Sequence, residues 1–317
     1  MFREPPFRHF SPFLKILSLI MIIIITFFIV LGIGVALSLP FFGTSLLESM
    51  AAQNDFTNPQ TILALKYFQI VNQIGVFIAP AILFVILTDD DFRGYLKFRG
   101  GIKRFSIVFG TILLIVSLPF ISWLVEVNNA IHLPESLAGL ETWMRNAEDN
   151  AHKLTDAFLS TTNWGGFLVN LLMIAVLAAI GEELIFRGIL VRLFREWTHN
   201  IHLAVIIPAL IFSALHLQFY GFFGRFMLGI LLGYLFVWSG SLWVPIFVHF
   251  LNNAMAVVIS FLDQRGWVDT DLETFGSSQN TTVIISSFIL MLFIMGIIYL
   301  HEKGYVRKRA RDTAGQA

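Results

Sequence analysis

Long apolar stretches recur along this chain, and they limit the folds open to it. The first runs from Phe13 to about Leu39, and comparable stretches follow as far as Leu300. About 20 apolar residues in a helix span the ~30 Å hydrocarbon core of a bilayer. Only 13% of the residues are charged, against about 25% in soluble domains. Because a spanning backbone must satisfy its own hydrogen bonds, the sequence predicts an all-α, polytopic membrane helix bundle.

Eight transmembrane helices are predicted, and four parts of the chain are expected. The first stretch is too long for the apolar region of a signal peptide, so it is expected to remain as a span. The predicted spans are 13–39, 61–88, 105–126, 166–194, 202–217, 225–238, 242–262 and 281–300. The expected parts are 1–126 with three helices, 127–164 between spans, 165–262 as a core of four helices, and 263–317 with the last helix and a basic tail.

The longest segment between spans has a helical pattern of its own. Its apolar residues recur every three or four positions: Leu140, Trp143, Met144, Ala147, Ala151, Leu154 and Phe158. This spacing predicts an extracytoplasmic amphipathic helix, either on the membrane surface or over the end of the bundle. This helix could form a lid packed on the spans or take part in substrate handling, and the sequence does not choose between the two.

The basic residues predict which side of the membrane each loop occupies. With both termini in the cytoplasm, fifteen of the 21 Lys and Arg residues lie on the cytoplasmic side and five lie outside. The positive-inside rule favours this orientation. The membrane is expected to be a bacterial inner membrane. The net charge is zero, so no nucleic-acid partner is expected. The chain has no cysteine, which excludes disulfides, Fe–S clusters and a cysteine nucleophile.

Three charged residues interrupt the fourth predicted span: Glu182, Glu183 and Arg187. A charge at mid-bilayer costs roughly 2.5–3.5 kcal/mol, and such groups usually face a bundle interior or a wet cavity. Glu183 and Arg187 are four residues apart and can pair on one helix face. Glu182 points about 100° away, has no local partner and must find a use elsewhere in the bundle.

Further polar residues interrupt later spans. His216 ends the fifth, and His249 lies in the seventh with Asn252 and Asn253. These helices are consecutive and their polar residues fall at similar depths, so the side chains are expected to converge. A buried Glu can take a proton from water while His and Asn stabilise an oxyanion. Glu182, His216 and His249 could instead hold a Zn²⁺ ion that activates the water. The residues alone leave both routes open.

Three motifs in this order resemble those of a known family. They are the Glu-Glu-x-x-x-Arg of residues 182–187, the Phe-x-x-x-His of residues 212–216 and the His-x-x-x-Asn of residues 249–253. This set is similar to that of the CPBP family, also labelled Abi. The family comprises intramembrane proteases like the type II CAAX prenyl endopeptidases and bacteriocin-processing enzymes. The resemblance covers about residues 166–262.

The resemblance implies a peptidase and a role for each site residue. Glu182 would be the catalytic base and His216 would help to activate the water. His249 and Asn253 would form the oxyanion site, while Glu183 and Arg187 would shape it. The family is known as metalloproteases, yet a metal-free glutamate mechanism has also been proposed, and the prediction here favours the metal-free route.

The expected substrate is a membrane-associated or prenylated-like protein or peptide. The rival reading is non-catalytic: a membrane scaffold or a bacteriocin-immunity-type protein. A proton-coupled transporter is less favoured, because two-halved transporters usually contain an internal repeat and none is visible here.

Overall fold

The computed structural model describes residues 4–43, 58–269 and 275–314, with side chains as far as residue 304. Within these ranges the chain forms helices and turns, and no strand. Seven helices are long and apolar enough to cross a membrane. The protein is therefore an integral membrane protein with an all-α bundle, as predicted. The side chains of the basic tail beyond residue 304, and most of the loop predicted after the first span, lie outside the described residues.

The elements follow one another along the chain as α1 (Pro12–Phe42), α3 (Pro59–Gln73), η1 (Ile74–Ile78), α4 (Ala79–Thr88), α5 (Phe92–Tyr95), η2 (Phe98–Gly100), α6 (Arg104–Asn129), η3 (Glu135–Leu137), α7 (Ala138–Leu159), α8 (Trp164–Asn170), η4 (Leu171–Leu177), α9 (Ala178–Glu183), η5 (Leu184–Leu190), α10 (Val191–Thr198), α11 (Ile201–Leu215), α12 (Phe222–Ser239), α13 (Trp243–Gln264) and α14 (Thr281–Ala314).

Two of the spans contain wider, π-helical turns. The second span runs without interruption from Pro59 to Thr88 and includes the π-helical η1, which directly precedes the turn that holds Pro80. The span that carries the charged residues, Trp164–Thr198, contains η4 and η5 on either side of α9. Such turns leave backbone groups without their regular partners and are frequent at functional sites.

One predicted span is shorter than expected. The stretch 202–217 forms α11, which has 15 residues from Ile201 to Leu215. At 1.5 Å per residue this helix is about 22 Å long, less than the ~30 Å core of a bilayer. The Asn200 side chain caps its start by accepting hydrogen bonds from two backbone N–H groups. Leu217, with φ at +52°, turns the chain away after the helix end.

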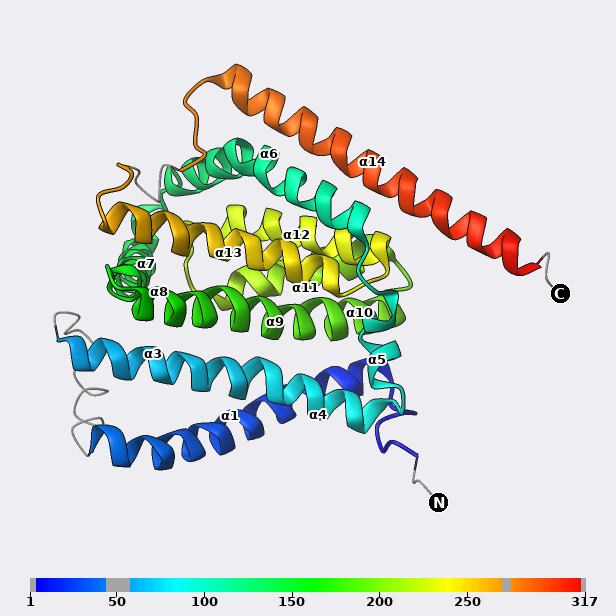
Figure 1. Cartoon of the computed structure of the whole chain (residues 1–317), viewed down its shortest axis with the longest axis horizontal. Helices are drawn as coiled ribbons and strands as arrows, with labels where there is room; N and C mark the ends of the chain where they lie inside the picture. The colour runs from blue at the N-terminus through cyan, green and yellow to red at the C-terminus, as the bar shows by residue number, and fades with distance from the viewer. Residues whose placement is uncertain (1–3, 44–57, 270–274, 315–317) are drawn as a thin grey trace.

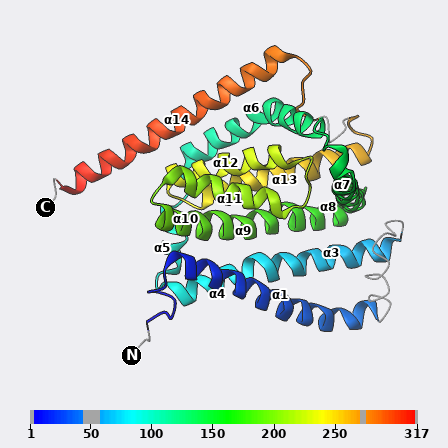
Figure 2. The same ribbon diagram turned by 180° about the vertical axis from the view of Figure 1, so that it is seen from behind.

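The helices lie roughly side by side, and their ends define two faces of the bundle. Figure 1 shows both chain ends at the same end of the bundle, where α5 lies, and α7 at the opposite end. The helix pair α1 and α3–α4 flanks the span of α9, with α11, α12 and α13 beyond it and α6 and α14 on the far side (Figures 1 and 2). This arrangement fits an even number of passages through the membrane, as predicted.

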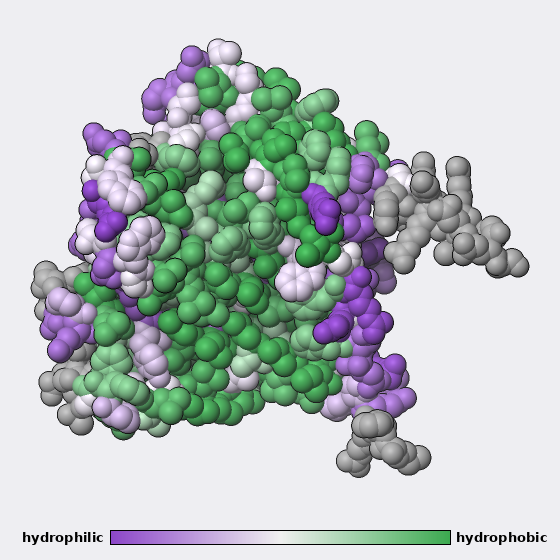
Figure 3. Space-filling model, viewed as in Figure 1, coloured by the Kyte–Doolittle hydropathy of each residue, from purple (hydrophilic) through white to green (hydrophobic). Residues whose placement is uncertain are grey.

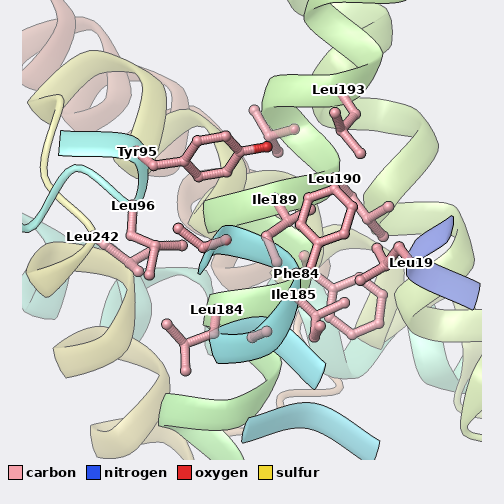
Figure 4. Close-up of a cluster of buried hydrophobic side chains, with 14 of the residues drawn as sticks. Leu19, Phe84, Tyr95, Leu96, Leu184, Ile185, Ile189, Leu190, Leu193 and Leu242 are labelled. Atoms are coloured by element: carbon pink, nitrogen blue, oxygen red, sulfur yellow. The ribbon is translucent and has the colours of Figure 1, made fainter. Parts of the chain in front are cut away.

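Apolar side chains cover the middle of the molecule and fill its interior. Figure 3 shows a hydrophobic band between hydrophilic residues at the two ends of the helices. The largest buried cluster joins α1, α4 and the span that contains α9. Figure 4 labels ten of its members: Leu19, Phe84, Tyr95, Leu96, Leu184, Ile185, Ile189, Leu190, Leu193 and Leu242.

The amphipathic helix α7 packs over the end of the bundle. Its Glu148 carboxylate accepts a hydrogen bond from the backbone N–H of Tyr220 at 2.9 Å. The Arg145 guanidinium lies 4.4 Å from the centre of the Tyr220 ring, and the Trp143 ring lies 5.2 Å from that of Phe219. Of the two predicted positions, the contacts support the one over the bundle end. α7 holds the loop that directly follows His216.

Candidate active site

A cluster of buried charges forms around Glu183. Its side chain is 0% exposed, and its Oε1 accepts hydrogen bonds from the Arg187 guanidinium at 2.5 Å and from Nδ1 of His249 at 2.8 Å. Arg187 is 1% exposed and also donates to the backbone carbonyl of Gly229 at 3.0 Å. The predicted pairing of Glu183 with Arg187 is present, and it extends to the seventh predicted span through His249.

Close packing of α11 against α12 gives Arg187 its second partner. A Cβ atom built on Gly229 would lie 2.9 Å from Cβ and 3.2 Å from Cα of Ala209. One built on Gly233 would lie 2.7 Å from a side-chain carbon of Val205. The two glycines are four residues apart, in the small-xxx-small spacing that permits close helix contact. The carbonyl of Gly229 can therefore face Arg187 inside the bundle.

Glu182 lies between this cluster and an apolar cavity. Its Oε2 is 3.7 Å from Nε2 of His249, and its side chain is 9% exposed. The cavity has a volume of about 670 Å³ and extends between α1, the α3–η1 segment, the α9–η5 segment and α11. Its walls include Glu182, His216, Phe212 and five residues of α1: Ile16, Leu19, Ile20, Ile23 and Ile24. Glu182 thus lies within ion-pair distance of His249 and also borders the cavity.

His216 reaches the same cavity from the end of α11. Its Nδ1 bonds to the backbone carbonyl of Phe212 at 2.7 Å, and its ring packs against the Phe212 ring with centroids 4.9 Å apart. The Phe212 ring also contacts His249, at 5.9 Å between centroids. Phe212 therefore packs between the two imidazoles, which leaves Nε2 of His216 as the nitrogen able to serve a molecule in the cavity.

Asn253 is held by hydrogen bonds outside the charge cluster around Glu183. Its amide donates to the backbone carbonyl of Ile174 at 3.0 Å, and its Oδ1 accepts from Asn252 at 3.1 Å. Ile174 lies in the π-helical η4, whose wider turn frees a carbonyl for such a bond. Within the described residues no hydrogen bond joins Asn253 directly to Glu182, Glu183 or a site histidine.

Two contributors were not predicted as parts of the site. Asn252 supports Asn253, and the carbonyl of Gly229 supports Arg187. The glycine spacing in 229–233 permits close helix contact, but a backbone acceptor leaves no mark of its own in a sequence. The cavity walls from α1 and α3 lie far from the motifs along the chain, so the motifs gave no sign of them.

The predicted zinc ligands do not fit a metal site in this arrangement. In the ranges that the structure describes, no three His, Asp or Glu side chains are grouped to hold a metal ion. One nitrogen of His249 is bound to Glu183, and one nitrogen of His216 is bound to a backbone carbonyl. A zinc-bound His commonly holds its other nitrogen in such a bond, so these bonds leave Nε2 of each imidazole for an ion. Glu182, His216 and His249 would have to move closer together to share one.

Comparison with known proteins identifies the part of the chain that carries the site. Residues 164–255 match the family model of the type II CAAX prenyl endopeptidase Rce1-like proteins. This part of the chain, the Rce1-like region, is similar to that family. The family resemblance predicted from the motifs is confirmed for the Rce1-like region, which contains all six predicted site residues. The cavity walls contributed by α1 and α3 lie outside the Rce1-like region.

One curated relative matches part of the chain. The uncharacterized protein YpbD of Bacillus subtilis (strain 168) is 31% identical over 90 residues, which are 27% of this chain and 43% of YpbD. The match therefore covers less than half of that relative. No solved structure matches the chain.

Proposed function

We propose that the protein is an intramembrane endopeptidase that hydrolyses a peptide bond of a membrane-associated or prenylated-like protein or peptide. One observation carries the proposal: Glu182 lies where a buried network of charges meets an apolar cavity. The match to the Rce1-like family, described as a type II CAAX prenyl endopeptidase, supports the same reaction class.

Glu182 is the proposed general base. It takes a proton from a water molecule, whose oxygen adds to the carbonyl carbon of the substrate. The C–N bond of the tetrahedral intermediate then breaks, and Glu182 returns the proton to the leaving amine. His216 lines the same cavity and is proposed to orient the water.

His249 is proposed to stabilise the oxyanion and to share a proton with Glu182. Glu182, Glu183 and Arg187 together carry one excess negative charge, which is costly to bury. One proton held on either His249 or Glu182 balances it. Because Glu183 holds Nδ1 of His249, Nε2 faces Glu182 and is free to give or take that proton. Asn253 would assist with the amide hydrogen that Ile174 does not use.

We propose the metal-free form of this reaction. In the described part of the chain, Glu182, His216 and His249 are not grouped closely enough to share one metal ion, which supports the route without zinc. We also propose that the protein resides in a bacterial inner membrane with both termini in the cytoplasm. The bias of Lys and Arg toward one side supports this orientation.

A comparison of protein termini in host membranes tests the proposal. Cells carry either the wild type or an equally abundant Glu182→Ala variant, and new N- and C-termini are quantified. Glu196→Ala is the matched control, since Glu196 lies on the same span, pairs with Arg192 and does not line the cavity. We expect a set of termini in wild type and Glu196→Ala that is absent from Glu182→Ala. Identical profiles in all three would favour the scaffold or immunity-type reading.

A further inference from the structure

A row of carboxamides faces the cavity from α3. Gln69, Asn72 and Gln73 all line the cavity, as do Glu182 and His216. Asn72 and Gln73 follow Gln69 by three and four residues, so both lie on the same side of the helix as Gln69. Polar side chains inside a membrane span are rare and usually functional. α3 lies beside the span of α9 in both ribbon views (Figures 1 and 2).

These amides have no partner in the part of the protein that the structure describes. Gln73 is 5% exposed, and its Oε1 is buried without a hydrogen bond. The side chains of Gln69 and Asn72 make no hydrogen bond to other described residues either. Amides that join membrane helices do so by bonding across the interface, and these do not. Leaving a buried polar group unpaired costs about 1–3 kcal/mol, so the row is suited to a ligand.

Gln73 also lies next to the proposed catalytic residue. Its Oε1 is 3.7 Å from the position that a Cβ atom on Gly181 would occupy, and Gly181 directly precedes Glu182. A bulkier residue at 181 would press on η1, since the same Cβ would be 2.8 Å from the Phe77 side chain. Close contact between the two spans therefore places the carboxamide near the reaction centre.

The spacing of the row matches an extended peptide. Gln69 and Gln73 are separated by four residues, or about 6 Å along a helix. Backbone groups that point the same way in an extended chain recur every two residues, or about 6.6 Å. A carboxamide carries both a donor and an acceptor, so it can pair with an N–H and a C=O of one peptide. A peptide in an apolar cavity needs such partners, because water is scarce there.

We propose that Gln69, Asn72 and Gln73 form a main-chain-binding wall that holds an extended, apolar peptide segment opposite Glu182. The isoleucines and leucine of α1 receive its side chains, and Gln73 bonds the backbone nearest the scissile bond. This inference rests on the proposed peptidase function and adds its substrate class. The three amides act as positioning residues.

The termini comparison extends to this wall with two more variants. Gln73→Leu removes the carboxamide and keeps an apolar side chain suited to the membrane. Gln60→Leu is the matched control, because Gln60 lies on the same helix, is exposed and does not line the cavity. We expect Gln73→Leu to fold normally but to produce the wild-type termini about threefold to tenfold more slowly, as for one lost hydrogen bond. Gln60→Leu should match wild type.

A purified system then separates binding from structure. A synthetic peptide that spans the identified bond is cleaved by the full-length protein in lipid nanodiscs. For Gln73→Leu we expect KM to rise while kcat changes little, and Gln73→Asn to restore part of the loss. A backbone ester in place of the contacted N–H should slow the wild type to the level of Gln73→Leu and leave Gln73→Leu unaffected.

The outcomes distinguish the two proposals. Suppose that wild type produces termini that Glu182→Ala lacks, but that Gln73→Leu cleaves at the wild-type rate with an unchanged KM. This result would overturn the proposed peptide-binding wall and leave the peptidase proposal standing. Additive losses from the ester and Gln73→Leu also overturn the wall. If wild type yields no termini of its own, the peptidase proposal fails, and the wall fails with it.

Discussion

At the scale of single residues, burial decides how much each charged side chain contributes to stability. Arg187 and Glu183 are almost fully enclosed and share their hydrogen bonds with His249 and Gly229. Arg192 and Glu196 form a similar i, i+4 pair at 3.1 Å on the same span, but both are partly exposed. The two pairs have the same chemistry and differ mainly in their access to solvent.

Arg187→Ala should therefore destabilise the protein strongly. Removing one partner of a buried pair leaves the other charge uncompensated and costs about 3–5 kcal/mol. Arg192→Ala should cost less than about 1 kcal/mol, as exposed pairs do. Folded yield and thermal unfolding in detergent measure both. The double variant Glu183→Gln with Arg187→Leu should recover part of the loss, because position 183 then carries no unpaired charge. A normal melting temperature for Arg187→Ala would contradict the pairing.

At the scale of elements, the contact between α11 and α12 supports the site. Gly229 gives Ala209 room to approach and presents its carbonyl to Arg187. The last turns of the short α11 line the cavity, and His216, directly after the helix, continues this wall. The geometry of the site thus depends on backbone contacts that are remote from the catalytic chemistry.

Gly229→Ala is expected to separate these two helices. The added methyl group would meet backbone-linked carbons of Ala209 that cannot move alone, and overpacking of this kind costs about 1–3 kcal/mol. Gly296→Ala on α14 is the control, since its new Cβ would have no neighbour within 4 Å. Thermal unfolding should show a lower melting temperature for Gly229→Ala only. Equal stability of the two variants would rule out the tight contact.

At the scale of the whole molecule, the arrangement separates two ends with different roles. One end holds α5 and both chain ends, and the other holds α7 over the loop that follows His216 (Figure 1). The proposed orientation puts the first end in the cytoplasm. Because the chain has no cysteine, introduced thiols can test this orientation directly.

Single cysteines at exposed positions should report opposite sides. Asp90→Cys lies between α4 and α5, and Asn150→Cys lies on α7. A membrane-impermeant maleimide added to intact spheroplasts should label Asn150→Cys alone, and lysis should expose Asp90→Cys. The unaltered protein, with no thiol, gives the background. Labelling of Asp90→Cys in intact spheroplasts would reverse the orientation.

Residue patterns were sufficient for the class of fold and for the motif residues. Long apolar stretches predict spanning helices because the bilayer requires a helix of that length with its hydrogen bonds made internally. Charges in such a stretch require partners, so the sequence alone singles out Glu182, Glu183 and Arg187. The pairing of Glu183 with Arg187 is local, four residues apart on one helix, and local geometry can be inferred from sequence.

Tertiary structure alone decided what lies around those residues. In the folded chain, Glu183 bonds to His249, and the short α11 is followed directly by His216 in the cavity wall. Asn253 bonds to a backbone carbonyl in a π-helical turn. The fold also brings Gln73 of α3 beside Gly181. These contacts join parts of the chain far apart in sequence or depend on backbone groups common to all residues. Sequence therefore determined which groups need partners, and the packing of helices determined which partners they have.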